Sequence, residues 1–243
     1  MIIRMPVPED IPQMKQLWQQ TFQDPIECID AFFTTGYRQD HSRILWDGEV
    51  LGAVYWFDLY WQGGRYGLVY ALAVAESRRG RGLGNCLMDQ VCRHLQSQDY
   101  TGAVLVPAGE HLYGFYRKLG FAHFGGADTV QIKASGQPVY LVKTSITEYL
   151  DDRPGFSWGD AFCAFVENQC VLYRAGDMRL ICYKDGADIQ EYIGPAERLP
   201  GVLAGLGLEQ ARVRMGGTKE PAGMYRLFKD AAQLPDYFGP ILD

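Results

Sequence analysis

Hydrophobic residues follow two different spacings on either side of a short segment rich in glycine and arginine. Residues 68–74, LVYALAV, form an unbroken apolar run of strand length that contains no Gly or Pro. From Leu83 onwards, apolar residues recur at every fourth position, at Leu87, Val91 and Leu95. This spacing places them on one face of an amphipathic helix. The pattern therefore predicts a strand, a loop and a helix in succession.

Comparable spacings divide the rest of the first half into short elements. Strands are predicted at 2–5, 44–46, 50–61, 101–106, near 130 and at 139–142, and helices at 10–22, 25–35 and 108–119. Asp47-Gly48 predicts a two-residue hairpin turn, and Gly63-Gly64 predicts a second turn. Gly120 predicts a left-handed cap at the end of the last helix. Together these elements predict alternating strands and helices around one sheet.

A polar, turn-rich segment at 144–157, TSITEYLDDRPGFS, predicts a boundary between two domains, 1–146 and 157–243. Beyond it, strands are predicted at 170–174, 179–183, 189–193, 212–215 and 225–228, and helices from 157 and over 196–206. Asp185-Gly186 predicts a hairpin turn. Three strands, a helix and a strand repeat the order of the first half.

The segment between the strand and the helix, residues 78–84 (RRGRGLG), is unfavourable for helix stability by itself. The first turn of a helix exposes unpaired N–H groups and the positive end of the macrodipole, so cations such as Arg79 and Arg81 are disfavoured there. A bound anion reverses the sign of that energy, and glycines let the backbone close around it. The segment therefore predicts a phosphate site, with a solvated basic turn as the alternative.

Two common phosphate-binding motifs do not fit this segment. A P-loop requires Lys followed by Ser or Thr after its second glycine, and neither is present. The dinucleotide fingerprint requires glycine at position 87, which is Leu87. A nucleotide-binding oxidoreductase is thereby disfavoured.

The pattern Arg79-x-x-Gly82-x-Gly84, after a strand that ends in 72–74 (LAV), resembles the acetyl-CoA signature of the GCN5-related N-acetyltransferase (GNAT) superfamily. A second segment, 112–121 (LYGFYRKLGF), resembles that superfamily's Phe-Tyr-x-x-x-Gly-Phe motif. The resemblance covers roughly residues 1–145. It implies an α/β (α+β) fold with a mixed, twisted sheet flanked by helices. A smaller GNAT-like second half follows, as in tandem-type members.

The resemblance also implies the coenzyme and the residues that hold it. Acetyl-CoA is the expected co-substrate, with its pyrophosphate on the loop amides and its pantetheine arm in a gap between the strands at 68–74 and 101–106. The expected coenzyme-binding residues are Leu72, Ala73, Val74, Arg79, Gly80, Arg81, Gly82, Leu83, Gly84 and Asn85. In the second half only Gly194-Pro195 separates strand from helix, so we expect no CoA loop there.

Acetyl transfer from a thioester requires a neutral amine, a donor to the tetrahedral oxyanion and an acid for the departing thiolate. The resemblance assigns the donor to the backbone N–H of Val74 and the acid to Tyr116, whose phenol keeps its proton at neutral pH. Packing in the core is the alternative role for Tyr116.

The general base is not identifiable from the pattern. A glutamate that many superfamily members carry before the loop is replaced by Leu68, Val69 and Tyr70. Asp58 is the best carboxylate candidate, with a surface role and a water relayed through Tyr70 as alternatives. An aromatic set could line an acceptor pocket or belong to the core: Trp56, Tyr60, Trp61 and Tyr66.

The amino-acid composition limits the kinds of binding partner and the location that we expect for the chain. Of 243 residues, 47% are hydrophobic and 21% are charged, as in ordinary globular proteins. The net charge of −6 disfavours nucleic-acid binding and is compatible with a cationic amine. The longest apolar runs are too short to span a membrane, and the N-terminus lacks the apolar segment of a signal peptide. Six cysteines without a C-x-x-C pair and four scattered histidines predict a cytoplasmic chain without a metal site.

The sequence therefore predicts an acetyl-CoA-dependent N-acetyltransferase that modifies a primary amine of a small molecule or peptide. A non-catalytic acyl-CoA-binding or sensing module is the alternative, because it needs the loop but no base. The second half has two possible roles. It could form one wall of the acceptor pocket, or it could mediate homodimer formation.

Overall fold

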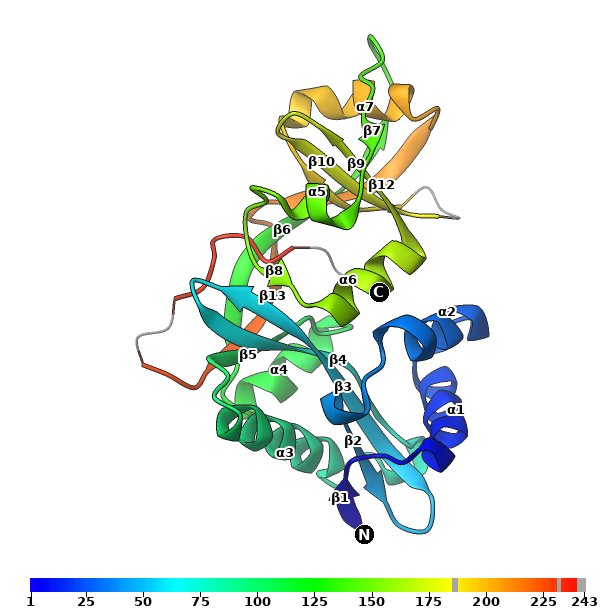
Figure 1. Cartoon of the computed structure of the whole chain (residues 1–243), viewed down its shortest axis with the longest axis vertical. Coiled ribbons are helices and arrows are strands. Elements are labelled where there is room, and N and C mark those ends of the chain that lie inside the picture. The colour runs from blue at the N-terminus through cyan, green and yellow to red at the C-terminus, as the bar shows by residue number, and fades with distance from the viewer. Residues whose placement is uncertain (185–187, 231–232, 240–243) are drawn as a thin grey trace. The chain divides into compact units, whose positions relative to one another are not determined.

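The computed structural model describes residues 1–184, 188–230 and 233–239, and the chain divides into two compact units (Figure 1). Unit 1 comprises Met1–Ala122, Trp158–Phe165 and Met224–Leu234. Unit 2 comprises His123–Ser157, Val166–Gly223 and a C-terminal segment that begins at Pro235. The turn predicted at Asp185-Gly186 lies outside the described residues.

Unit 1 is built on a mixed sheet in the order β1-β2-β3-β4-β5-β13. Its strands are β1 (Ile2–Arg4), β2 (Ser42–Trp46), β3 (Val50–Trp61), β4 (Gly64–Val74), β5 (Gly102–Leu105) and β13 (Glu220–Leu227). The helices of this unit are α1 (Ile11–Phe22), α2 (Ile26–Ala31) with a π-helical turn at Phe32–Gly36, α3 (Leu83–Ser97) and α4 (Glu110–Lys118). The β4–β5 pair is parallel, and the β1–β2, β2–β3, β3–β4 and β5–β13 pairs are antiparallel.

Helices cover both faces of the central strands of unit 1. Figure 1 shows α1 and α2 on one side of β3 and β4, and α3 and α4 on the other. The predicted apolar face of α3 is buried, because Leu83 is 8% exposed and Leu87, Val91 and Leu95 are fully buried. The expected mixed sheet flanked by helices is thereby confirmed.

Unit 2 has its own mixed sheet, in the order β6-β12-β11-β10-β9-β7. The strands are β6 (Ala122–Lys133), β7 (Val142–Lys143), β9 (Cys170–Ala175), β10 (Met178–Tyr183), β11 (Ile189–Ile193) and β12 (Gln210–Gly216). The helices are α5 (Ile146–Leu150) and α7 (Leu199–Gly205). A further strand, β8 (Ser157–Trp158), and helix α6 (Asp160–Gln169) lie where the chain passes between the units.

The two sheets share one topology. In unit 1, β2, β3 and β4 are antiparallel, α3 follows, and β5 is parallel to β4. In unit 2, β9, β10 and β11 are antiparallel, α7 follows, and β12 is parallel to β11. The second half therefore repeats the first in reduced form.

The terminal strands differ from the sequence expectation. The strands predicted near 130 and at 139–142 were expected to complete the first half, but β6 pairs with β12 and β7 with β9. Instead β13 completes the sheet of unit 1 by pairing with β5 from Met224 to Leu227. Strands of both halves alternate alike, so the pattern does not choose between these partners. The compact units are consequently interleaved, unlike the predicted domains 1–146 and 157–243.

The first hairpin turn is longer than predicted. Trp46 pairs with Val50, so three residues, Asp47 to Glu49, connect β2 and β3 rather than two. The Asp47 N–H donates to the Glu49 carbonyl (3.0 Å), and Gly48 takes a left-handed conformation (φ 80°). Gly48 therefore supplies the left-handed residue of a three-residue turn with a local bulge.

A buried ionic network lies in the core of unit 2. Arg153 binds both carboxylate oxygens of Glu191, through Nη2 at 2.5 Å and Nε at 3.1 Å. Tyr149 and Tyr237 also donate to this carboxylate. The Arg153 and Glu191 side chains are 1% and 0% exposed, so each charge depends on the other.

We expect Glu191→Gln to destabilise unit 2 by about 3–5 kcal/mol, because the Arg153 guanidinium stays buried without its counter-charge. Urea unfolding measures this loss. The control is Asp188→Asn, which breaks a pair with Arg212 whose side chains are 44% and 59% exposed. It should cost less than about 1 kcal/mol. Equal small effects of both substitutions would show that the network is not what holds unit 2 together.

Candidate functional site

Strand β4 is interrupted by a bulge at the centre of unit 1. Tyr70 lies opposite Tyr55 and Ala73 lies opposite Ala53, so Ala71 and Leu72 share one position of β3. Ala71 has φ 50°, which a non-glycine residue rarely adopts. Such strain costs of order 1–3 kcal/mol and clusters at functional sites. The bulge therefore marks this part of β4 as a candidate site.

Beyond the bulge, one edge of β4 is open. The parallel ladder joins residues 66–69 of β4 to residues 102–105 of β5 and ends at the pair Val69–Leu105. Residues 70–74 therefore continue without a partner on that side within the ladder. The end of this pairing is compatible with the expected gap between the two strands.

The N–H group of Val74 points to this open edge. The Ala75 N–H donates to the Leu51 carbonyl at 2.9 Å, which makes these residues a hydrogen-bonded pair of the β3–β4 ladder. Because such pairs alternate, the neighbouring pair of Gly52 and Val74 directs its N–H and C=O groups outward. On that side the Val74 carbonyl accepts a hydrogen bond from Arg79 Nε at 3.0 Å.

The loop after β4 presents a run of free amides. Among the described residues, no acceptor receives the backbone N–H groups of residues 80–85. Gly80 (φ 75°) and Gly82 (φ 76°) take left-handed conformations, and Gly82 is the N-cap of α3. The first backbone hydrogen bond of the helix is Cys86 N–H to the Gly82 carbonyl. Six successive donors at the positive end of a 15-residue helix form an arrangement suited to an anion.

The charged side chains within the loop, residues 78–84, all have the same sign. The first turn of α3 contains no acidic residue, so nothing offsets the helix dipole there. Arg79 and Arg81 are exposed, and the Arg79 guanidinium is held at the strand end by its bond to Val74. An anion at the loop would therefore meet backbone donors and two guanidinium groups.

Helix α4 brings the second motif to the same place. A methyl group added at Gly84 would lie 3.4 Å from the Phe115 ring and 4.0 Å from the Val74 side chain. The strand end, the loop and α4 therefore meet. The adjacent Tyr116 is 7% exposed and packs in the core with Leu72 and Val74 at its border.

The phenol of Tyr116 is kept protonated. Burial raises the pKa of Tyr116 to about 12. No described residue forms a hydrogen bond with its hydroxyl in the structure. The hydroxyl of Tyr116 therefore keeps its proton at neutral pH.

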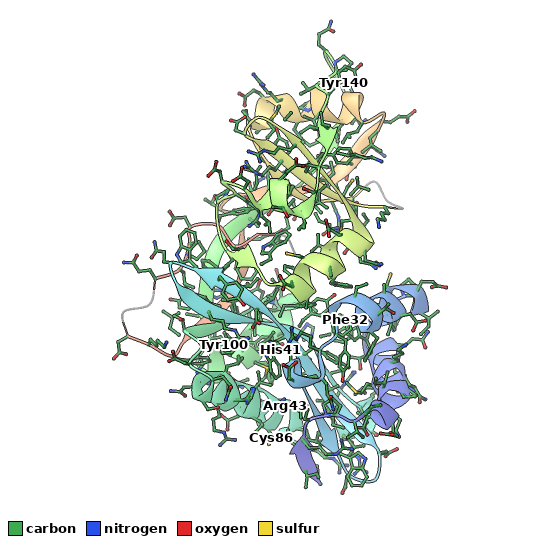
Figure 2. All side chains as sticks on the ribbon, in the orientation of Figure 1. Phe32, His41, Arg43, Cys86, Tyr100 and Tyr140 are labelled. Carbon is green, nitrogen blue, oxygen red and sulfur yellow. The ribbon has the colours of Figure 1, made fainter. Side chains whose placement is uncertain are left out.

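Asp58 lies in a network at the other end of β3. Arg65 binds its carboxylate at 2.7 and 3.1 Å, Tyr100 donates at 2.6 Å and His41 Nε2 lies at 3.2 Å. Figure 2 labels His41 and Tyr100 in this network. Burial raises the pKa of Asp58, but the hydrogen bonds from His41, Arg65 and Tyr100 outweigh it and hold that pKa well below its ordinary value.

These contacts have a consequence for the base candidate. Asp58 pairs with Gly67, whereas the bulge lies opposite Val54, four positions along β3. A carboxylate that accepts several charge-assisted hydrogen bonds and has a depressed pKa is a weak base. Asp58 therefore has the features of a structural residue that joins β3, β4 and the segment before β5.

The expected aromatic set is not gathered at one place. Trp56 lies in the core under α3, Tyr60 is 43% exposed, and the Tyr66 hydroxyl donates to the Gln233 carbonyl. A different set packs on the opposite face, beside the bulge: Trp18, Phe32, Phe33, Tyr37, Tyr55 and Tyr70. We call it the aromatic cluster. Neighbouring side chains along a strand point to opposite faces of the sheet. The sequence alone therefore allows the prediction that Tyr55 and Trp56 lie on different faces.

Unit 2 lacks an equivalent loop among its described residues. Gly194-Pro195 leads into the short helix α7. Backbone of the segment before β7 packs on that helix, where the Val139 N–H donates to the Gly201 carbonyl at 2.8 Å. A methyl group at Gly201 would lie 2.6 Å from the Gln137 carbonyl oxygen. The surface of α7 is therefore occupied by the chain itself.

The described residues lack two other features, a metal-binding cluster and a membrane-spanning helix. No group of three or more His, Cys, Asp or Glu side chains there is arranged to hold a metal ion. None of the helices in that part of the chain combines the length and hydrophobicity needed to cross a bilayer.

Solved structures with the same fold carry acetyltransferase names. A putative acetyltransferase from Pyrococcus horikoshii has a TM-score of 0.68 at 16% identity, over 99% of this chain and 94% of its own. A GCN5-related N-acetyltransferase from Anabaena variabilis has a TM-score of 0.67 at 16% identity, over 94% and 73%. One from Kribbella flavida has a TM-score of 0.62 at 16% identity, over 93% and 70%. At this identity the likeness concerns the fold.

The family comparison covers the part of the chain that holds the bulge, the loop and α4. A comparison with curated proteins gives no match. Residues 11–121 match the model of the family described as Acetyltransferase (GNAT) family. Residues 11–121 of this chain are therefore a GNAT acetyltransferase domain.

Proposed function

We propose that the chain is an acetyl-CoA-dependent N-acetyltransferase that acetylates a primary amine of a small molecule or peptide. The observation that carries this proposal is the run of amides at residues 80–85, which have no acceptor among the described residues. It stands at the start of α3, beside the open edge of β4, in a domain of the GNAT family. A diphosphate would satisfy these amides, and an extended arm would satisfy the strand edge.

Each part of the coenzyme has a matching part of the chain. The loop amides with Arg79 and Arg81 would bind the pyrophosphate. The edge at Leu72, Ala73 and Val74 would pair with the pantetheine arm. The acetyl group then lies near Val74, whose N–H faces that edge and would donate to the oxyanion.

The transfer itself needs one proton donor and one acceptor. The amine nitrogen attacks the thioester carbonyl carbon, and the C–S bond breaks as the amide forms. Tyr116 gives its phenol proton to the departing thiolate. The attacking amine loses a proton to water, and water returns a proton to Tyr116. Tyr116 thereby regains the proton that it gave to the thiolate.

We do not assign the base role to Asp58, because its carboxylate is bound by Arg65 and Tyr100. We propose instead that water passing Tyr70 takes the proton. Tyr70 is half-buried and lies directly before the bulge.

A second candidate function follows from the same observation. Without a free carboxylate at the bulge, the domain could bind an acyl-CoA and transfer nothing. In both cases we propose acetyl-CoA as the bound coenzyme. Cysteine usage in the sequence supports a location in the cytoplasm. For the second half, homodimer formation and a wall for the acceptor pocket remain the two proposed roles.

Release of CoA thiol from acetyl-CoA distinguishes the two functions. We expect thiol release that depends on an added primary amine and rises with pH, because only the neutral amine attacks. A panel of ring-bearing amines, aliphatic amines and short peptides is screened by thiol titration. Acetyl-CoA binding without amine-dependent release from any of them would favour the non-catalytic module.

A further inference from the structure

The aromatic cluster on the α1–α2 face contains a hydroxyl with no partner. Tyr55 is 2% exposed, and its hydroxyl oxygen is buried without a hydrogen-bond partner among the described residues. Leaving such a group buried and unpaired destabilises the folded state. Phenylalanine at this position would avoid that cost and fill the same space.

The indole of Trp18 in the aromatic cluster is paired, because its N–H donates to Asp24 at 2.7 Å. Rings surround Tyr55 closely, with centroids of Phe32 at 5.1 Å, Trp18 at 5.4 Å and Phe33 at 5.9 Å. Aromatic rings therefore pack around the ring of Tyr55, and Figure 2 labels Phe32 in this set.

The position of Tyr55 connects it to the proposed reaction centre. It lies directly opposite Tyr70, one residue before the bulge. Strands rise about 3.3 Å per residue, so Leu72 and Val74 lie roughly 7–13 Å further along β4. That span is comparable to the length of a small arylalkylamine. Phe33, Tyr37 and Tyr70 are only half-buried, so the outer side of the aromatic cluster reaches solvent.

We propose that Tyr55 is a specificity-determining residue whose hydroxyl hydrogen-bonds a polar ring substituent of the acceptor, and that the acceptor is an amine on an aromatic body. This inference rests on the proposed function. Aromatic rings favour a ring-bearing ligand through offset and edge contacts. Burying the second charge of an aliphatic diamine among these rings is unfavourable, because apolar surface does not replace the water that the charge loses.

Two amines that differ by one hydroxyl test the assignment, tyramine and 2-phenylethylamine. We expect the wild-type chain to use tyramine with a kcat/KM at least roughly tenfold higher. In Tyr55→Phe this preference should vanish, mainly through a higher KM for tyramine. The melting temperature of the coenzyme-free variant should be equal or higher, since the unpaired hydroxyl is gone. A preference that survives in Tyr55→Phe, or a loss of stability in that variant, would overturn the proposal.

The control is Tyr66→Phe, which removes a hydroxyl of β4 that is already bonded, to the Gln233 carbonyl at 2.7 Å. It should lower the melting temperature and leave the preference for tyramine intact. Calorimetry with the CoA-loaded protein provides a readout without turnover. Binding of tyramine without acetylation of any amine would refute the transferase function but keep the ligand class. Failure of both ring-bearing amines to bind, with other amines acetylated, would refute the ligand class alone.

Discussion

The double variant Arg79→Glu/Gly82→Asp is expected to lose acetyl-CoA binding, with affinity at least a hundredfold below that of the wild-type chain. Gly82 has φ 76°, which aspartate adopts only with strain, and it is the N-cap of α3. One carboxylate would replace the Arg79 guanidinium, and a second would be added at position 82, beside the diphosphate. The loss of charge-assisted hydrogen bonds and the added repulsion together weaken the binding free energy of acetyl-CoA by about 3 kcal/mol or more. Isothermal titration calorimetry with acetyl-CoA measures the change.

A matched control separates loop chemistry from backbone strain. Gly48 also has a left-handed conformation (φ 80°) and open space around it, but it lies in the β2–β3 turn. Gly48→Asp should therefore carry a similar strain and leave acetyl-CoA affinity unchanged. Unaltered binding in the double variant, with the chain folded by circular dichroism, would refute the role of the loop.

The second large effect is expected from Tyr116→Phe, which should lower kcat by about 10²–10³-fold. In the proposed mechanism the hydroxyl gives its proton to the thiolate, whereas the ring of phenylalanine would fill the same space in the core. Acetyl-CoA affinity and melting temperature should therefore stay close to wild type. Steady-state turnover with an accepted amine, combined with calorimetry, separates chemistry from binding.

Two further measurements check the role of Tyr116. Tyr113→Phe removes a hydroxyl from the same helix, α4, and should leave kcat within about twofold. The pKa of Tyr116, raised to about 12 by burial, predicts that the donor stays protonated well above neutral pH. The wild-type rate should therefore show no decline between pH 7 and about 10. Normal turnover by Tyr116→Phe would remove this residue from the mechanism.

The site elements that the sequence predicts are those formed by local interactions. The helix from Leu83 and the loop before it follow from apolar spacing and from glycines within seven residues. Gly120, predicted as a left-handed cap, has φ 83°. Such features depend on neighbours along the chain, so their physical cause is visible in the sequence.

The surroundings of Asp58 depend on residues that the pattern does not bring together. His41, Arg65 and Tyr100 come from different elements, 17, 7 and 42 positions away from Asp58. No local spacing predicts that their side chains converge on one carboxylate. An aspartate on an aromatic strand is compatible with both a base and a salt bridge, and only the tertiary structure reveals the bridge.

The sequence pattern also does not predict which strand pairs with β5. The pattern treats β6 as the natural continuation of the first half, because it follows α4 directly. In the structure β13 takes that place, from the far end of the chain. Edge pairing is decided by register and packing over long separations, which alternation alone does not encode.

The central claim is that amides of residues 80–85 bind the diphosphate of acetyl-CoA. A crystal structure of the chain with CoA tests it most directly. We expect diphosphate oxygens within about 3 Å of several of these N–H groups, with the pantetheine arm along the open edge of β4. A diphosphate bound elsewhere, with the loop amides paired to protein or solvent, would contradict the account.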